Sequence, residues 1–323
     1  MEAQKQYGLS MVRFIAMITI IMCHILQYSD NVACYYLNIG VWLYLFISGF
    51  IYGKKDIGNV MLFYKQRLVR ILVPYYIMLG AIIIVNLLQG ENTSVKGLLS
   101  SIMCLQWYGN TVPNCGHLWY ISCILFCYLI TPVLRWICEQ NKNMSLIKKY
   151  ILLALAILML QATYSLGGMN QVTTSILPYI LGYFISTNKT VLNMRGGGVM
   201  LAILAANVGL YCLLYASEAL GIFAVPDIFL NYYKSIVSGA ITMFFMQYSF
   251  RNMHVRRLLD LSDKYSYGIY LTHHIFILGS LSLMSFTPYL SLNIAMILFV
   301  TVITGVALIW ASDKMVALFK KRG

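Results

Sequence analysis

Two ionisable residues interrupt the first long apolar run of the chain, residues 10–28. Arg13 and His24 are eleven residues apart, which in an α-helix is three turns plus about 20° and about 16 Å of rise. Both side chains therefore share one face of the expected helix. Ionisable groups in a bilayer are costly and usually face a protein interior or a water-filled cavity. The pair indicates a site, although a snorkelling arginine and a hydrogen-bonded interior histidine would also explain it.

A second group of candidate side chains lies in YSYGIYLTHH, residues 265–274. Tyr267, Tyr270 and His274 follow the spacing of one helical face, and His273 lies one step round from it. Because neighbouring residues on a helix point in different directions, we expect at most one of the two histidines to belong to an interior site. Either histidine is equally explained as a neutral, hydrogen-bonded core residue.

A third candidate region is NCGHLWYIS, at the end of the long segment 89–116. His117 and Trp119 are expected at the outer mouth of a membrane span. There they would be the first groups to meet a polar substrate that arrives from outside. An interfacial tryptophan is ordinarily a membrane anchor, and His117 is equally explained as a solvated loop residue.

The composition requires a membrane to position these residues. The 323 residues are 60% hydrophobic and only 10% charged, whereas soluble domains carry roughly 25% charge. The formal net charge of +13 is explained by Lys and Arg in cytoplasmic loops, so we expect no nucleic-acid partner. The eight cysteines form no CxxC pair and no His/Cys metal-ligand spacing, so no metal site is expected.

A spanning helix needs about 20 mostly apolar residues. On that measure the fold class is all-α: a polytopic membrane protein with about ten transmembrane helices and no separate soluble domain. The sixth expected span is short and contains Pro178. The spans are expected at 10–28, 33–53, 71–89, 118–137, 147–166, 172–187, 197–217, 229–250, 266–284 and 288–311.

The distribution of basic residues predicts the orientation. With both termini in the cytoplasm, only Lys96 and Lys234 of the 23 basic residues fall on the outer side, and Arg13 lies within the first span. This orientation places Arg13 near the cytoplasm and His24 toward the outer third of the membrane.

The segment 54–76, KKDIGNVMLFYKQRLVRILVPYY, predicts an interfacial amphipathic helix that runs into the third span. Its basic side chains would meet anionic lipid head groups or a phosphate-rich cytoplasmic ligand. Arg67 and Arg70 share a helix face, and arginine suits bidentate phosphate binding. Lys65 lies beside them.

Taken together, these segments resemble the membrane-bound acyltransferase-3 family, whose members O-acylate cell-surface carbohydrates. The resemblance covers nearly the whole chain and implies a single acyltransferase-3-like transmembrane domain over 1–323. Five landmarks occur in the family's order: Arg13 and His24 as Arg-x10-His, NIGVWLYLFISGFIYG at 38–53, FYKQRLVRILVPYY at 63–76, HLWYIS at 117–122, and YSYGIYLTHH at 265–274, with Tyr270 and His273 as its Tyr-Leu-x-His pair.

The resemblance implies an acyltransferase, most often an O-acetyltransferase, in a bacterial plasma membrane. Its donor substrate would be acetyl-coenzyme A, with no permanently bound cofactor, and its acceptor a polysaccharide or glycolipid hydroxyl. The donor would dock at Lys65, Arg67 and Arg70. Catalysis is assigned to Arg13 and His24, and acceptor binding to His117, Trp119, Tyr270 and His273.

One departure from the family pattern concerns the second span. Many members carry an acid two or three positions after its Gly-Val pair, whereas here Gly40 and Val41 precede Trp42, Leu43 and Tyr44. Span two therefore offers no carboxylate to orient His24 or to pair with Arg13. Any role of that carboxylate must be absent or supplied from another segment.

The mechanism has two forms at this stage. His24 either removes the proton of the acceptor hydroxyl or carries the acyl group covalently. No Gly-x-Ser-x-Gly elbow is present to support a serine relay. The rival function is a membrane transporter or flippase for a glycan or small polar solute, which the Pro178 span would suit.

Overall fold

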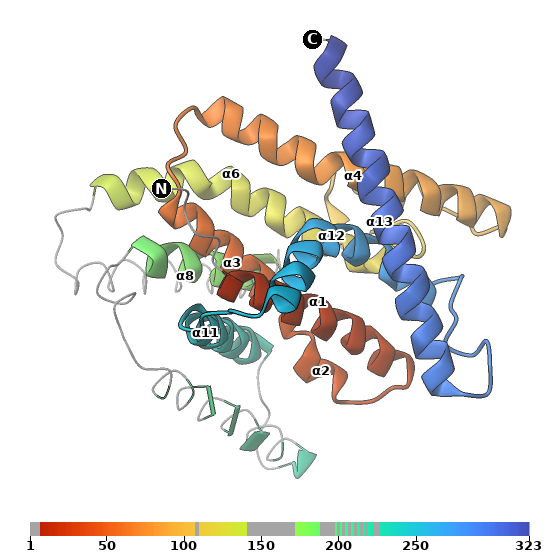
Figure 1. Ribbon diagram of the computed structural model, residues 1–323. Coiled ribbons are helices and arrows are strands. Elements are labelled where there is room, and N and C mark those ends of the chain that lie inside the picture. The colour runs from red at the N-terminus through yellow and green to blue at the C-terminus, as the bar shows by residue number, and fades with distance from the viewer. Residues whose placement is uncertain are drawn as a thin grey trace. The chain divides into compact units, whose positions relative to one another are not determined.

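The computed structural model describes residues 7–106, 110–140, 172–187 and 227–322, with isolated positions between 198 and 221 (Figure 1). Within these ranges every regular element is helical, which confirms the all-α class. The helices are α1 (Tyr7–Tyr28), α2 (Cys34–Leu37), α3 (Ile39–Lys54), α4 (Val60–Leu88), α5 (Val95–Ile102), the 3-10 helix η2 (Gly116–Leu118), α6 (Trp119–Gln140), α8 (Val172–Thr187), α11 (Asp227–Met246), α12 (Met253–Ile277) and α13 (Leu290–Arg322).

Several helices have the length and apolarity of membrane spans. Five such segments occur in the described part of the chain, and α8 contributes a shorter apolar helix. The spans expected at 147–166 and 197–217 fall outside the continuously described ranges, so the count of ten and the cytoplasmic termini stay predictions. The five are Tyr7–Tyr28, Cys34–Lys54, Val60–Leu88, Gly116–Gln140 and Leu290–Leu318.

The span expected at 266–284 has the wrong limits. Helix α12 begins at Met253 and ends at Ile277, because its first turns are charged and escape a search for apolar runs although they are helical. The following residues turn: the Ser280 amide donates to Asn114 Oδ1 at 2.9 Å. The helix is therefore amphipathic at its start and buried toward its end.

The chain folds into two compact units. Unit 1 comprises Met1–Val12, Trp42–Gly58 and Phe126–Arg256, and unit 2 comprises Arg13–Val41, Asn59–Leu125 and Arg257–Gly323. Each unit is thus assembled from segments that are distant in the sequence.

Unit 1 packs helices through very close backbone contacts. A Cβ atom on Gly49 of α3 would lie 2.0 Å from the Tyr179 carbonyl oxygen of α8, and one on Gly182 would lie 2.2 Å from the Phe46 carbonyl oxygen. Helix α11 packs against α8. Small residues at such crossings let membrane helices approach closely.

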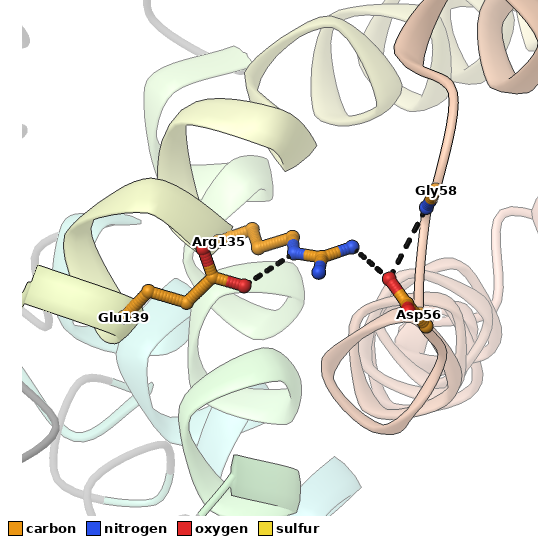
Figure 2. A network of polar contacts seen from close by, with 4 residues as sticks. All are labelled: Asp56, Gly58, Arg135 and Glu139. Atoms are coloured by element: carbon orange, nitrogen blue, oxygen red, sulfur yellow. Dashed lines mark hydrogen bonds and ion pairs between the residues drawn. The ribbon is translucent and has the colours of Figure 1, made fainter.

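The polar groups of unit 1 serve this packing. Lys234, within α11, is buried with its ammonium 4.8 Å from the ring centroid of Trp42. At the end of α3, Asp56 accepts from the Gly58 amide and pairs with Arg135 of α6, whose Nε donates to Glu139 at 2.6 Å (Figure 2). The Gly58 amide and then the guanidinium hold the pKa of Asp56 below its ordinary value.

Unit 2 is built around three long helices. Helix α13 packs against α4 (Figure 1), and α12 meets α13 where a Cβ on Gly268 would lie 2.3 Å from the Gly305 carbonyl oxygen. The Tyr267 hydroxyl donates to the Ile71 carbonyl of α4 at 2.9 Å. Helix α4 begins after Asn59, whose side chain accepts from the Leu62 amide, so the basic segment and the third span form one continuous helix.

Candidate active site

Four histidines of unit 2 lie ring against ring. The ring centroid of His24, from α1, is 5.1 Å from that of His273 and 5.1 Å from that of His274 on α12. The centroid of His117, from η2, is 5.3 Å from that of His273 and 4.5 Å from that of His274. We call these four residues the histidine cluster.

The expectation that at most one of the adjacent histidines belongs to an interior site is wrong. His273 and His274 both contact His24 and both contact His117. Adjacent side chains diverge by about 100° on a helix. His24 from α1 and His117 from η2 both lie against this part of α12. His273 and His274 therefore contact the same two rings although their side chains diverge.

Hydrogen bonds determine where three of the four rings carry their protons. A carbonyl oxygen only accepts, so a ring nitrogen bonded to it must be the N–H donor. His273 Nδ1 is 2.6 Å from the Tyr270 carbonyl oxygen, and His117 Nε2 is 3.2 Å from the Leu271 carbonyl oxygen. His24 Nδ1 is likewise 3.0 Å from Gln27 Oε1.

The opposite ring nitrogens of His24, His117 and His273 then carry lone pairs. His117 Nδ1, His273 Nε2 and His274 Nδ1 are buried and have no hydrogen-bond partner among the described residues. Buried polar atoms in folded proteins usually have partners, so each exception calls for an explanation. A cluster of neutral imidazoles whose lone pairs remain available can accept protons or hydrogen bonds from a hydroxyl-bearing ligand.

Contacts among the neighbouring loops fix His117 in this arrangement. The Tyr270 hydroxyl donates to the His117 carbonyl at 2.5 Å. Asn114 adopts a left-handed backbone conformation with φ of 66°, and its Nδ2 donates to Asn86 Oδ1 at 2.6 Å and to Ser280 Oγ at 3.1 Å. These bonds join the end of α4, the loop before η2 and the loop after α12. His117 is consequently buried, with 5% of its surface exposed, rather than a solvated loop residue.

Arg13 is paired with a carboxylate of α12. Arg13 Nη1 lies 3.0 Å from Asp263 Oδ1, and 27% and 14% of the two side chains are exposed. The contact joins residues 250 positions apart in the sequence. Asp263 therefore gives Arg13 the anionic partner that its own neighbourhood in the sequence does not contain.

The remaining predicted site residues lie on α6 and α4. Trp119 is half-buried at the start of α6, and the ring of its neighbour Tyr120 lies 5.3 Å from that of Tyr270. On the first turns of α4, Lys65 and Arg70 are exposed and Arg67 is half-buried. Because Lys65 and Arg70 are exposed, their charges are accessible to a phosphate in solution or to lipid head groups.

Sequence reasoning did not identify Gln27 or Asp263, and it considered His274 without assigning it to the site. Gln27 was detectable, since it lies one turn after His24 on the same helix face. A second signal concerned α12, where Asp263 and His274 repeat the eleven-residue separation of Arg13 and His24. Among the described residues no group of His, Cys, Asp and Glu is arranged to hold a metal ion.

Comparison with known proteins adds one match. A family model described as an acyltransferase domain matches residues 6–312. No curated protein and no solved structure matches the chain. The matched range contains the whole histidine cluster together with Arg13 and Asp263.

Proposed function

Because the chain belongs to the acyltransferase-3 family of membrane acyltransferases, we propose that it transfers an acetyl group from cytoplasmic acetyl-coenzyme A to a carbohydrate hydroxyl. The acceptor is a cell-surface or exported polysaccharide or a glycolipid. The protein acts as a multi-pass enzyme of a bacterial plasma membrane, with about ten spans and both termini in the cytoplasm. The family match supports the reaction class, and the site geometry supports the roles of individual residues.

The observation that carries the proposal is the state of the His24 ring. Its Nδ1 donates to Gln27 Oε1 at 3.0 Å, which leaves Nε2 with a lone pair. That nitrogen takes the proton of the acceptor hydroxyl as the oxygen attacks the thioester carbon. The new C–O bond forms, the C–S bond breaks, and the proton passes from His24 to the departing thiolate.

The donor is proposed to bind at the basic start of α4. Coenzyme A is rich in phosphate, and Lys65, Arg67 and Arg70 supply three cations within two helical turns. Lys65 and Arg70 are exposed, as required for a ligand that arrives from the cytoplasm. Arg13 is the next cation toward the site, although its guanidinium already bonds Asp263.

The acceptor is proposed to meet His117 and His273. Both rings have their N–H group bonded to a backbone carbonyl, so each offers an acceptor nitrogen to a sugar hydroxyl. Tyr270 supports His117 through its hydroxyl and presents its ring beside both histidines. Trp119, at the start of α6, is proposed to stack on the sugar outside them.

The test follows the label of acetyl-coenzyme A. Membranes that contain the protein are incubated with donor labelled in the acetyl group, and the glycan fraction is assayed for label that mild base releases. We expect base-labile, ester-linked label and free coenzyme A in equal amounts. Movement of an unmodified glycan or solute across the membrane without donor consumption would instead identify a transporter or flippase and overturn the proposal.

A further inference from the structure

We infer that Asp263 is a positioning residue of the active site: its ion pair with Arg13 sets α1 and α12 in register and so holds His24 against His273 and His274. The inference rests on the proposed acyl transfer for its kinetic consequence. Its structural part concerns only how α1 and α12 are placed against each other. Arg13 thereby has a structural role, through Asp263, in addition to the catalytic role expected from the sequence.

The two helices carry matching pairs of residues. Arg13 precedes His24 by eleven residues, and Asp263 precedes His274 by eleven residues. The first members of the pairs are joined at 3.0 Å, and the ring centroids of the second members are 5.1 Å apart. Both separations correspond to about 16 Å along a helix axis. The helices therefore run in the same direction, in contact at both ends of an equal interval.

This geometry makes the ring contacts sensitive to register. A slip of one residue moves a helical side chain by about 1.5 Å along the axis and turns it by about 100°. Such a turn would carry His24 away from His273 and His274 together. In the described structure the three rings form no hydrogen bond to one another, so ring contacts alone hold them loosely, whereas a directed ion pair fixes one relative position of the helices.

Removal of the Asp263 charge should disturb the packing of the two helices. Only 14% of the Asp263 side chain is exposed, so removal of its charge leaves the partly buried Arg13 guanidinium without its carboxylate. Breaking one member of a buried pair costs considerably more than the pair itself contributes, because the remaining charge is uncompensated. A movement of α1 that brings the Arg13 guanidinium into water would then lower the free energy, and the same movement would displace His24.

The kinetic test compares Asp263→Asn with Asp263→Glu. For Asp263→Asn we expect kcat to fall at least about tenfold, since misplaced catalytic groups cost one to two orders of magnitude, while KM for acetyl-coenzyme A stays within about twofold. Asp263→Glu retains the charge and should recover most of kcat. Asp260→Asn, one turn earlier on the exposed side of α12, makes the same charge change and should leave both constants unaltered.

Two kinetic results would overturn the inference. An Asp263→Asn enzyme with normal kcat would show that the ion pair does not position the cluster. A rise in KM for the donor with kcat unchanged would show that the pair serves donor binding through Arg13.

A cross-linking measurement separates the inference from the proposed activity. His24→Cys and His274→Cys are combined, treated with a short bis-methanethiosulfonate reagent, and mapped by mass spectrometry to distinguish them from native cysteines. We expect efficient cross-linking in this background and at least a severalfold loss when Asp263→Asn is added. Equal yields would overturn the inference even if the enzyme is active. Acetyl transfer is measured separately on the protein with His24 intact, and its absence there, beside the expected cross-linking, would refute the proposed function alone.

Discussion

Two groups of polar side chains, one in each unit of the molecule, are used in opposite ways. In the described part of unit 1, the polar groups of Figure 2 pair with one another, and backbone meets backbone across Gly49 and Gly182. In unit 2 three imidazole nitrogens of the histidine cluster are buried without a hydrogen-bond partner among the described residues. The network of Figure 2 and the glycine crossings therefore have the properties of a scaffold, whereas the histidine cluster retains buried groups whose bonding capacity is available to a ligand.

This difference separates stability from reactivity. A contact that satisfies every group contributes to folding and has nothing left to offer a substrate. An unsatisfied buried nitrogen costs folding free energy, which is tolerated where binding or catalysis uses it. Substitutions in unit 1 should therefore act through the amount of folded protein, and substitutions in the histidine cluster through turnover.

The largest expected effect tests the reactive side of the comparison. His24→Ala should lower acyl transfer by about 10²- to 10⁴-fold, the range typical of a lost general base, while the protein still inserts in the membrane. The measurement is the rate of ester formation at matched amounts of protein. His254→Ala is the matched control, because His254 is an exposed residue of the same helix as His273 and His274. Comparable rates for His24→Ala and wild type would remove His24 from the mechanism.

The second effect tests the scaffold side. Gly49→Ala places a Cβ 2.0 Å from the Tyr179 carbonyl oxygen, so α3 and α8 must separate, at a cost of about 1–3 kcal/mol for overpacking. We expect a lower thermal midpoint in detergent and unchanged turnover per folded molecule. Gly80→Ala is the control, since a Cβ on Gly80 of α4 meets nothing within 4 Å. Loss of turnover with a normal midpoint would contradict the division between the units.

A smaller effect concerns the basic start of α4. Arg70→Ala should raise KM for acetyl-coenzyme A by about two- to fivefold, because an exposed ion pair contributes at most about 1 kcal/mol. Arg67→Ala should act in the same direction, and kcat should be retained in both. Lys96→Ala removes an exposed cation from α5 and serves as the control. Unchanged KM in both arginine variants would assign these residues to lipid head groups.

The smallest effect concerns the ion pair of Figure 2. The pKa of Asp56 is held below its ordinary value, so its contribution to stability is complete above the pKa of the unfolded chain and disappears as the pH falls through the lower, folded value. The thermal midpoints of wild type and Asp56→Asn should therefore differ slightly at neutral pH and converge only in strong acid, below about pH 4. A difference that persists throughout acid titration would show that the carboxylate charge is not responsible.

Much of the fold was predictable because a bilayer imposes its thickness on the sequence. The runs expected at 10–28 and 118–137 coincide closely with α1 and α6. The start of α12 was not predictable by the same measure, because its charged residues give no apolar run. Helix formation there depends on local propensity and packing rather than on lipid.

The candidate site was predictable in its members more than in its contacts. His24, His117 and His273 were each identifiable from spacing or resemblance, but their mutual contact depends on how α1, η2 and α12 pack. Asp263 was missed because its partner is 250 residues away, and the eleven-residue spacing from Asp263 to His274 does not by itself identify that partner. His274 was not assigned to the site because only one of two adjacent side chains on α12 was expected to face the protein interior. In the structure both His273 and His274 contact His24 of α1 and His117 of η2.

Helix α4 has a consequence for the membrane in which the protein works. Its 29 continuous residues extend for about 44 Å, whereas the hydrocarbon layer of a bilayer is about 30 Å thick. About 14 Å of rigid helix, enough for the turns that carry Lys65 and Arg67, must project beyond the lipid tails or be accommodated by tilt. Lipids with longer chains would shorten that projection, so the height at which the basic turns meet the aqueous phase is set by bilayer thickness as well as by the protein.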